Sequence, residues 1–358
     1  MGMHGSDGVS GLLVAPSPAD PEPRPARARR GKGFVAAVIA GALVLVSVSG
    51  AMAYFGFRTS LDENIERIAD PFAAIDPLTR PAPAPAQGTT APMNILMLGS
   101  DSRISAGDPT QWEFGAQRTD AIMLVHLSAD RQSAAAISIP RDSWVPIPGF
   151  GEAKINAAFS YGGPTLMIQT VENLTGVRID HFAVADFESF TTLTDTLDGV
   201  EITVPDGAGG SVEQAMTGEE ALDFTRERYA LANGDFGRVQ RQQAWMRAIA
   251  VKVTEDRSDL LKMSRFLGAV TRSVAVDEGL TIGKMQDLLI SSRELSTGDI
   301  TFMTAPYAGT GRSADGQSIV LLDRAGFDPL MQAVAKDEVP AYLAENPAGI
   351  DMLPAVVQ

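Results

Sequence analysis

The sequence predicts an α/β protein, an α/β/α sandwich with a mixed central sheet, preceded by a single transmembrane helix. The first observation is a series of short, almost wholly apolar segments, such as 94–99 (NILMLG), that have the composition of buried strands. The second is that segments with helical periodicity alternate with them. Strands that are apolar on both faces need cover on both sides of the sheet, and helices supply it.

The individual elements follow from the same patterns. The expected strands lie at 94–99, 121–127, 134–139, 181–186, 200–204, 300–305 and 318–322. The expected helices lie at 164–175, 187–197, 218–224, 237–254, 258–274, 282–295 and 324–335. A short link, ADRQS, joins 121–127 to 134–139 and predicts an antiparallel pair, so the sheet is expected to be mixed.

An uncharged run of 24 residues, 34–57, is the third observation. As a helix it would be about 36 Å long, enough to cross a hydrocarbon core of about 30 Å. Five basic residues between Arg24 and Lys32 precede it, whereas Arg58, Asp62 and Glu63 follow it, so the N-terminus is expected in the cytoplasm and the main domain outside the cell. The alternative is a cleaved signal peptide, because Ala51-Met52-Ala53 fits a small-x-small cleavage site.

These features divide the chain into five parts. Prolines are frequent in 71–92, which predicts a semi-stiff spacer, and 58–70 is expected to include a short amphipathic helix. The expected parts are a disordered cytoplasmic tail (1–32), the transmembrane helix (33–57), a Pro-rich extracellular linker (58–92), one catalytic domain (93–340) and a C-terminal tail (341–358).

Composition excludes several classes of function. The chain has 358 residues and a net charge of −15, and its basic tail makes the remainder more acidic still. An acidic domain is a poor match for nucleic acid, which needs a positive surface. The sequence has no cysteine and three histidines, which rules out disulfides and thiol catalysis and makes a zinc site improbable.

An arginine-rich stretch, 226–243 (RERYALANGDFGRVQRQQ), stands out against that acidic background. A strand through FTRERY would point Arg226 and Arg228 to one side, and a helix would place Arg238, Gln242 and Trp245 on one face. Guanidinium groups bind phosphate oxygens through paired hydrogen bonds. The stretch therefore predicts a phosphate pocket. The alternative is a solvated helix whose charges are neutralised by Glu227 and Asp235.

Polar residues also follow or precede the expected strands. They form four short segments, and ligands of open α/β sheets collect at such strand ends. Two carboxylates among them, Asp101 and Asp120, suit Mg²⁺, which takes one or two carboxylates together with phosphate oxygens and water. The alternative for each segment is an ordinary turn or helix cap. The segments are 100–103 (SDSR), 118–120 (RTD), 140–142 (PRD) and 154–156 (KIN).

Together these segments resemble the LytR-CpsA-Psr (LCP) proteins of Gram-positive cell envelopes. The motifs occur in the order NILMLGSDSR, RTDAIMLVHL, ISIPRDSWVPIPG, KINAAFSYGGP, VENLTGVRIDHF, LDFTRERY and DFGRVQRQQ. The resemblance implies an LCP catalytic domain that takes a polyprenyl-pyrophosphate-linked glycan donor. It implies transfer of the phospho-glycopolymer to a hydroxyl of a peptidoglycan acceptor, outside the cell, by a membrane-anchored phosphotransferase.

The resemblance also assigns roles to residues. Asp101 and Asp120 match the family's Mg²⁺ (or Mn²⁺) carboxylates. Further pocket residues that contact the substrate are expected among the polar side chains of the same motifs. The general base is left open between Asp235 and a metal carboxylate, and His181 is expected to be structural. The full catalytic set is Asp101, Asp120, Arg118, Arg141, Arg226, Arg228 and Arg238, and the substrate-binding set is Arg103, Lys154, Asn156, Asp235, Arg241 and Gln242.

Two other functions use the same pocket. A hydrolase would use water in place of the acceptor, and a membrane-tethered regulator would bind the lipid-linked glycan without turnover. The resemblance implies an apolar channel for the prenyl tail, and certain apolar side chains suit either such a channel or an ordinary core. These are Phe159, Leu166, Met167, Phe187, Phe190, Leu193 and Leu197.

Overall fold

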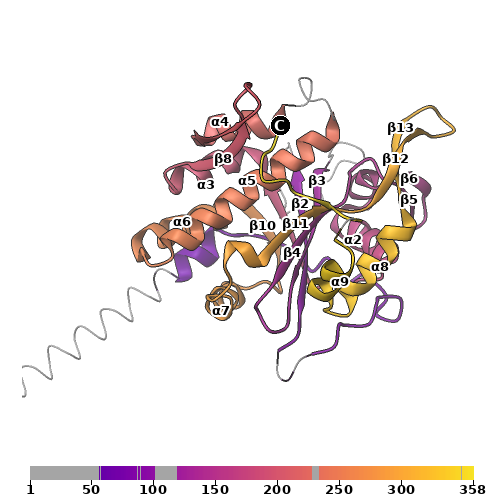
Figure 1. Cartoon of the computed structure of the whole chain (residues 1–358). Helices are drawn as coiled ribbons and strands as arrows, with labels where there is room; N and C mark the ends of the chain where they lie inside the picture. Colours follow the sequence, from indigo (N-terminus) through magenta and orange to yellow (C-terminus); the bar gives the residue numbers. More distant parts are fainter. Residues whose placement is uncertain are drawn as a thin grey trace, which may run out of the picture. The chain divides into compact units, whose positions relative to one another are not determined.

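The computed structural model describes residues 56, 58–86, 88, 90–100, 119–227, 234–347 and 349–358 (Figure 1). Its centre is an eight-stranded sheet in the order β1-β10-β7-β2-β3-β4-β11-β14. The strands are β1 (Glu66–Ile68), β2 (Met93–Ser100), β3 (Thr119–Leu127), β4 (Ala134–Ser138), β7 (His181–Asp186), β10 (Val274–Asp277), β11 (Ile300–Thr304) and β14 (Asp351–Met352).

The sheet is mixed, as the sequence predicts. β3 pairs antiparallel with both β2 and β4, whereas β2 and β7 are parallel, as are β4 and β11. The short link between β3 and β4 allows a hairpin, and a parallel pair needs the longer crossover that a helix provides. The antiparallel prediction for 121–127 and 134–139 is therefore confirmed.

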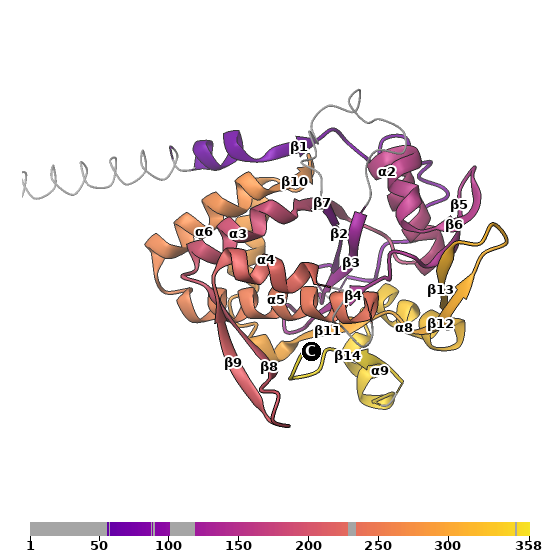
Figure 2. The ribbon, with the colours of Figure 1, turned by 90° about the horizontal axis from the view of Figure 1, so that it is seen from above.

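Helices cover both faces of this sheet. Alternate side chains of β2 point to opposite faces: Leu96 and Leu98 belong to the core that includes the helices α2 and α8, while Met97 packs with residues on the other side. Figure 2 shows α2 and α8 on one side of the strands and α3 to α6 on the other. The helices are α2 (Asn156–Thr175), α3 (Phe187–Thr196), α4 (Gly218–Arg226), α5 (Asp235–Asp256), α6 (Leu260–Ser273), α7 (Ile282–Ser291), α8 (Arg324–Ala335) and α9 (Val339–Glu345). The predicted sandwich is confirmed.

Helix α2 begins earlier than the periodicity predicts. The expected start was residue 164, whereas the helix extends back to Asn156 and is interrupted at Gly162 and Gly163. Gly163 has a φ of 62°, a conformation that glycine adopts without steric cost. Pro164 then begins the second part, where its missing N–H is tolerated. Because the glycine pair interrupts the helical repeat of apolar residues, the first turns of α2 are not recognised from the sequence pattern.

Two expected strands lie outside the central sheet. Residues 200–204 fall in β8 (Val200–Pro205), which pairs with β9 (Ser211–Met216), and 318–322 form β13 (Ser318–Leu322), which pairs with β12 (Tyr307–Arg312). A third hairpin joins β5 (Trp144–Ile147) to β6 (Gly151–Lys154). An apolar strand in a hairpin has the same composition as one in a sheet, so the pattern alone does not separate them.

The segment expected to be a spacer is part of the fold. Residues 58–64 are helical, and β1 pairs with β10 at the edge of the central sheet. Leu61 and Ile75 are buried in hydrophobic clusters, and Arg80 forms an ion pair of 2.7 Å with the buried Glu172 of α2. The prolines of this segment stiffen it, but the apolar and charged side chains between them hold it against the domain.

Removing Arg80 tests this attachment. In Arg80→Ala, the carboxylate of Glu172, whose side chain is 2% exposed, loses its cation, and leaving a buried charge unpaired costs about 3–5 kcal/mol. We expect the free energy of unfolding in urea to fall by that amount. The control is Arg293→Ala, since its ion pair with Glu294 is exposed and is worth less than about 1 kcal/mol. Equal stability of the two variants would show that 71–90 does not contribute to the fold.

The C-terminal residues also pack against the domain, although the sequence predicted a separate tail over 341–358. α9 and β14 follow α8, and β14 pairs with β11. Val357 is fully buried, and its N–H donates to the carbonyl of Thr203 at 3.0 Å. The carbonyl of Gln358 accepts from Arg241. Valine burial and backbone hydrogen bonds, rather than a periodic pattern, order this segment.

The predicted membrane span falls, apart from Gly56, outside the described residues. Among the helices that the structure describes, none combines the length and the apolar character that crossing a bilayer requires. The transmembrane helix therefore stays a prediction from the sequence. The apolar side chains that suited a channel or a core are core residues wherever they are described: Phe159, Leu166, Met167, Leu193 and Leu197 are all buried.

Candidate active site

Four charged side chains from three elements meet at one end of the central sheet, and we call them the charged cluster: Asp120, Arg141, Asp235 and Arg238. Arg141 donates through Nη1 to Asp120 Oδ1, and its Nη2 lies 3.4 Å from Asp235 Oδ1. Arg238 Nη2 lies 2.7 Å from Asp235 Oδ1 and its Nη1 lies 3.9 Å from Asp120 Oδ1. Each arginine thus contacts both carboxylates.

The chain brings these residues together from separate regions. Asp120 is the second residue of β3, Arg141 lies in the loop that follows β4, and Asp235 and Arg238 occupy the first turn of α5. Because β3 and β4 are antiparallel neighbours, the start of one lies beside the end of the other. The structure therefore brings Asp120 and Arg141 together at neighbouring strand ends, as the sequence analysis expected.

The cluster is largely shielded from solvent. The side chain of Arg238 is 8% exposed and that of Asp120 is 12% exposed. Buried charges are costly unless they are paired, and here each charge has opposite charges beside it. Arg238 Nε is also buried and has no hydrogen-bond partner among the described residues. A buried donor without a partner is unfavourable, so a ligand oxygen placed against this Nε would satisfy it.

Helix α5 is held in place by two contacts that the sequence analysis missed. The fully buried Gln243 donates through Nε2 to Ser138 Oγ and to the carbonyl of Met303, both at 2.8 Å. Phe236 stacks on Tyr307 with ring centroids 4.1 Å apart and planes inclined by 10°. The first contact ties α5 to the ends of β4 and β11, and the second ties its first turn to β12. Neither has a local sequence signal, because each joins residues far apart in the chain.

Losing the Gln243 contacts should displace α5 and, with it, Arg238. Gln243→Ala leaves the carbonyl of Met303 without that donor in a buried site, and an unsatisfied buried group costs about 1–3 kcal/mol. We expect that loss in the free energy of unfolding, together with lower turnover, because Arg238 lies on the same helix. The control is Gln240→Ala, a glutamine of α5 that is only partly buried. If Gln243→Ala kept full stability and turnover, Gln243 would not anchor α5.

The buried face of α5 agrees with the prediction. Arg238, Gln242 and Trp245 are all buried, and Trp245 Nε1 donates to Thr194 Oγ1 at 2.9 Å. Gln242 follows Arg238 by one helical turn on that face. His181 is structural, as expected, since it is buried and its Nδ1 lies 3.0 Å from Asp277 Oδ2.

Arg226 lies in a helix, whereas the sequence analysis placed it in a strand. α4 ends at Arg226, and a capping box starts the helix: Thr217 Oγ1 accepts from the N–H of Glu220, whose carboxylate accepts from the N–H of Thr217. That cap stabilises a helix over GEEALDFTR and overrides the strand reading of FTRERY. Arg226 is exposed, and the contacts described for the charged cluster do not include it.

Arg241 was expected to bind substrate and instead contacts the protein's own backbone. Its Nε donates to the carbonyl of Gln358 at 2.6 Å, and its Nη1 donates to the carbonyl of Phe224 at 3.1 Å. The guanidinium also lies over the Phe224 ring, 4.4 Å from its centroid. These contacts join α5, α4 and the C-terminus. Four other predicted site residues, Asp101, Arg103, Arg118 and Arg228, lie outside the described residues.

A pocket of about 390 Å³ adjoins the charged cluster, and Arg141 lines it. Lys154 and Asn156, both predicted to bind substrate, line the same pocket. Lys154 Nζ lies 3.1 Å from Asp142 Oδ1, and the N–H of Asn156 donates to the carbonyl of Arg141 at 3.2 Å. The structure therefore brings the PRD and KIN segments together, as the sequence analysis expected of strand ends.

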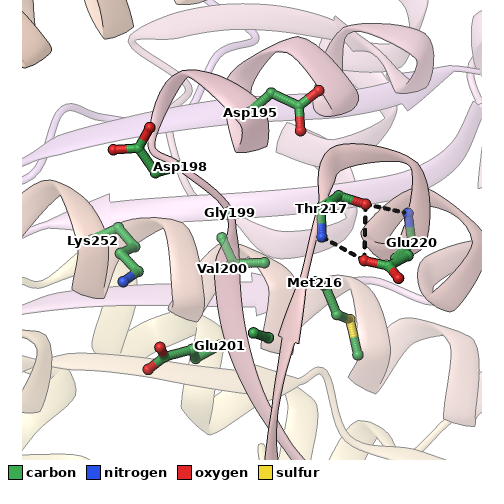
Figure 3. A pocket seen from close by; sticks show the side chains of 10 residues that line it. Asp195, Asp198, Gly199, Val200, Glu201, Met216, Thr217, Glu220 and Lys252 are labelled. Atoms are coloured by element: carbon green, nitrogen blue, oxygen red, sulfur yellow. Dashed lines mark hydrogen bonds between the residues drawn. The ribbon is translucent and has the colours of Figure 1, made fainter.

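A second pocket, of about 240 Å³, lies at the base of the β8–β9 hairpin (Figure 3). It is lined by carboxylates, and Lys252 is its cation. Its acidic side chains have local roles: Glu220 belongs to the cap of α4, and Asp195 accepts from the N–H of Gly218 at 2.7 Å. An acidic lining repels phosphate, so this pocket is a poor candidate for the predicted ligand.

Among the described residues of the charged cluster, Asp120 is the predicted ligand of a divalent cation. Both arginines contact the same carboxylate oxygen, Oδ1, and a carboxylate is the type of ligand that Mg²⁺ takes together with phosphate oxygens and water. Within the described part of the chain, no group of three or more histidine, aspartate or glutamate side chains is arranged for a metal. Asp120 therefore suits a metal that is completed by substrate and by the predicted Asp101.

Comparison of the sequence with known proteins identifies the family of this chain. Residues 71–336 match the LytR_cpsA_psr family, and this region is most of the chain. The chain belongs to the LytR-CpsA-Psr family. The match begins at residue 71, within the segment that packs on α2 and β10.

Several curated relatives come from this family. The chain is 34% identical over 269 residues to the probable cell wall biosynthesis protein LcpB of Corynebacterium glutamicum, covering 70% of this chain and 63% of LcpB. It is 30% identical to LcpA of the same organism over 277 residues, covering 64% of this chain and 53% of LcpA. It is 34% identical over 206 residues to a Bacillus cereus protein named polyisoprenyl-teichoic acid–peptidoglycan teichoic acid transferase TagU, covering 55% and 63%. The matched regions thus span between half and two thirds of these relatives.

Solved structures support the fold. Protein gbs0355 of Streptococcus agalactiae superposes with a TM-score of 0.58 at 21% identity, covering 69% of this chain and 88% of that one. TagV of B. subtilis superposes with a TM-score of 0.57 at 23% identity, covering 69% and 97%. At this identity the likeness concerns the fold, and the α/β domain with its mixed central sheet is the LCP domain.

Proposed function

We propose that the protein transfers a phospho-glycopolymer from a polyprenyl-pyrophosphate-linked donor to a peptidoglycan hydroxyl. The observation that carries the proposal is the charged cluster, in which two arginines and two carboxylates converge at the sheet end beside a polar pocket. Such a cluster suits a pyrophosphate diester, whose negative charges need neutralising before a nucleophile can approach. The names of LcpA, LcpB and TagU support the same assignment.

In this mechanism the arginines bind the pyrophosphate. Arg141 and Arg238 exchange part of their contact with Asp120 and Asp235 for phosphate oxygens, and the buried Nε of Arg238 gains an acceptor. Asp235 orients both guanidinium groups. Asp120 and the predicted Asp101 would hold Mg²⁺ (or Mn²⁺), which would add positive charge beside the phosphate oxygens.

The reaction breaks one P–O bond and forms another. The acceptor hydroxyl oxygen attacks the phosphorus that carries the glycan, the bond from that phosphorus to the bridging oxygen breaks, and polyprenyl phosphate leaves with the electron pair. The hydroxyl proton passes to a carboxylate of the site or to solvent. Because donor and acceptor are both cell-envelope molecules, the proposal places the domain outside the membrane, in line with the predicted anchor.

A direct assay tests the proposal. The full chain in detergent is incubated with Mg²⁺, a short polyprenyl-pyrophosphate-linked disaccharide and peptidoglycan oligomers, and mass spectrometry follows the products. We expect a phospho-disaccharide joined to the oligomer. Release of free sugar phosphate alone would replace the transferase with a hydrolase, and donor binding without any product would replace it with a regulator.

A further inference from the structure

We propose that helix α7 lies on the membrane surface and contacts the lipid through its exposed apolar side chains. Leu289 and Ile290, adjacent residues near the end of α7, are 49% and 64% exposed. Apolar side chains lose contact with water when they enter the boundary of a bilayer, which is favourable. The contact requires the membrane helix that the sequence predicts, and it is independent of the transfer reaction.

The group of exposed apolar side chains extends to the start of α6. Leu261, in the first turn of α6, is 61% exposed. Arg257 Nη1, just before α6, donates to the carbonyl of Arg293, just after α7, at 2.8 Å, so the start of one helix lies close to the end of the other. Single apolar side chains are ordinary on a protein surface, whereas a group of them is characteristic of a contact site. A contact site is therefore expected at this junction.

The residue that follows the predicted membrane span lies against α7. The uncharged run ends at residue 57, and the helix over 58–64 follows it. Leu61 of that helix and Ile282 of α7 belong to one hydrophobic cluster, and Figure 1 shows the two helices next to each other. A Cβ atom added to Gly283 would lie 3.2 Å from Arg58 Nη2. Arg58 is therefore next to the first turn of α7.

The exposed end of α7 lies within reach of the bilayer. Ile290 follows Gly283 by seven residues, which places it on the same face of the helix, the face beside which Arg58 lies. It is about 10 Å further along the helix axis, and the headgroup layer of a bilayer is roughly 5–8 Å thick on each side. If α7 runs along the membrane, Ile290 meets the boundary between headgroups and acyl chains.

The charges near this group suit a lipid surface. Lys284 and Asp287 are exposed on α7, and Arg293 lies 3.8 Å from Glu294, so charges of both signs are present and no strongly acidic or basic partner is favoured. Long basic side chains can keep their charged ends among the headgroups while their stems lie along apolar surface. A tethered domain also meets its own membrane at a high effective concentration, which a diffusing partner lacks.

A single fluorescent label tests the contact, because the chain has no cysteine of its own. Ile290→Cys is labelled with bimane, and the full chain is reconstituted in phosphatidylcholine vesicles that contain a phospholipid with a nitroxide on its acyl chain. The matched control is Leu321→Cys, since Leu321 is 44% exposed on β13, on the opposite side of the molecule from α7 in Figure 1. An interfacial helix buries its apolar face by roughly 5–10 Å, so the nitroxide should quench the label at position 290 at least about threefold more strongly than the label at position 321.

The other results of this experiment would overturn the lipid contact. Equal quenching of the two labels, or quenching of neither, would exclude a specific contact through α7. A blue shift of the label at position 290 without quenching would show that protein, such as a second copy of the chain, covers α7 instead of lipid. A chain that does not float with the vesicles would lack the membrane helix on which the contact depends. None of these readouts involves transfer, so an inactive transferase leaves them unaffected.

A second experiment tests whether apolar character produces the contact. The label is placed at Leu289→Cys, and Ile290→Asp is compared with Ile290→Val in the same chain. A charged side chain is costly at the bilayer boundary, so Ile290→Asp should lower the quenching of the neighbouring label at least about twofold, whereas Ile290→Val should leave it unchanged. Because Ile290 is exposed, both variants should unfold at the temperature of the native chain. Equal quenching in the two variants would overturn the contact.

Discussion

Arg141→Ala should lose transfer almost completely while the protein stays folded. Arg141 is the one described side chain that both contacts the two carboxylates of the charged cluster and lines the adjoining pocket of about 390 Å³. Removing a group that stabilises charge in a transition state lowers kcat by about a hundredfold to a thousandfold. We expect kcat of the mass-spectrometric assay to fall by at least that factor.

The effect on stability should be much smaller. Without Arg141, Asp120 keeps Arg238 at 3.9 Å and Asp235 keeps Arg238 at 2.7 Å, so neither carboxylate is left without a cation nearby. The free energy of unfolding in urea should fall by about 1–3 kcal/mol, the value of hydrogen bonds to a charged group. A loss of activity that simply follows unfolding at the assay temperature would contradict a role in catalysis.

Two further variants make this result specific. Arg141→Lys keeps the positive charge but loses the planar fork that grips two oxygens at once, and it should recover only part of the activity. Arg324→Ala removes an arginine whose ion pair with Asp328 is exposed, and it should change neither kcat nor stability measurably. Activity of Arg141→Ala within threefold of the native protein would remove Arg141 from the site.

The sequence was sufficient for the centre of the fold because the information there is local. The strands 94–99, 121–127, 134–139 and 181–186 are short apolar runs, and all four lie side by side in the central sheet. A strand that is buried on both faces must consist almost entirely of apolar residues. The pattern therefore identified the core, and the rule that ligands collect at strand ends predicted that Asp120 and Arg141 lie close together, as they do.

The sequence was insufficient where the deciding contact is distant. Prolines in 71–92 predicted a spacer, whereas Arg80 reaches Glu172 in α2, 92 residues along the chain. Gln243 looks like an ordinary surface residue in the sequence, and only the packing of α5 on β11 gives its side chain buried partners. The strand prediction for Arg226 was wrong for a different reason, because the helix cap at Thr217, nine residues before it, outweighed the strand propensity of FTRERY.

The second large effect concerns the two carboxylates, which have similar surroundings and different predicted roles. Asp120 and Asp235 each contact Arg141 and Arg238 through Oδ1. We expect Asp120→Asn to lower kcat at least about a hundredfold, as removal of a group that stabilises transition-state charge does, and to abolish the response to Mg²⁺. Asp235→Asn should lower kcat through poorer arginine orientation but leave the residual activity dependent on Mg²⁺. The measurement is kcat against Mg²⁺ concentration, starting from chelated protein.

Binding of inorganic pyrophosphate distinguishes the effect of each carboxylate's charge from the effect of a bound metal ion. In EDTA, each asparagine variant removes one negative charge next to two guanidinium groups, so both should bind pyrophosphate more tightly than the native chain does. With Mg²⁺ added, affinity should rise in the native chain and in Asp235→Asn and stay unchanged in Asp120→Asn, because only Asp120 is a predicted metal ligand. If Asp120→Asn still gained affinity from Mg²⁺ while Asp235→Asn did not, the metal would belong to Asp235, and Asp120 would serve to orient the arginines.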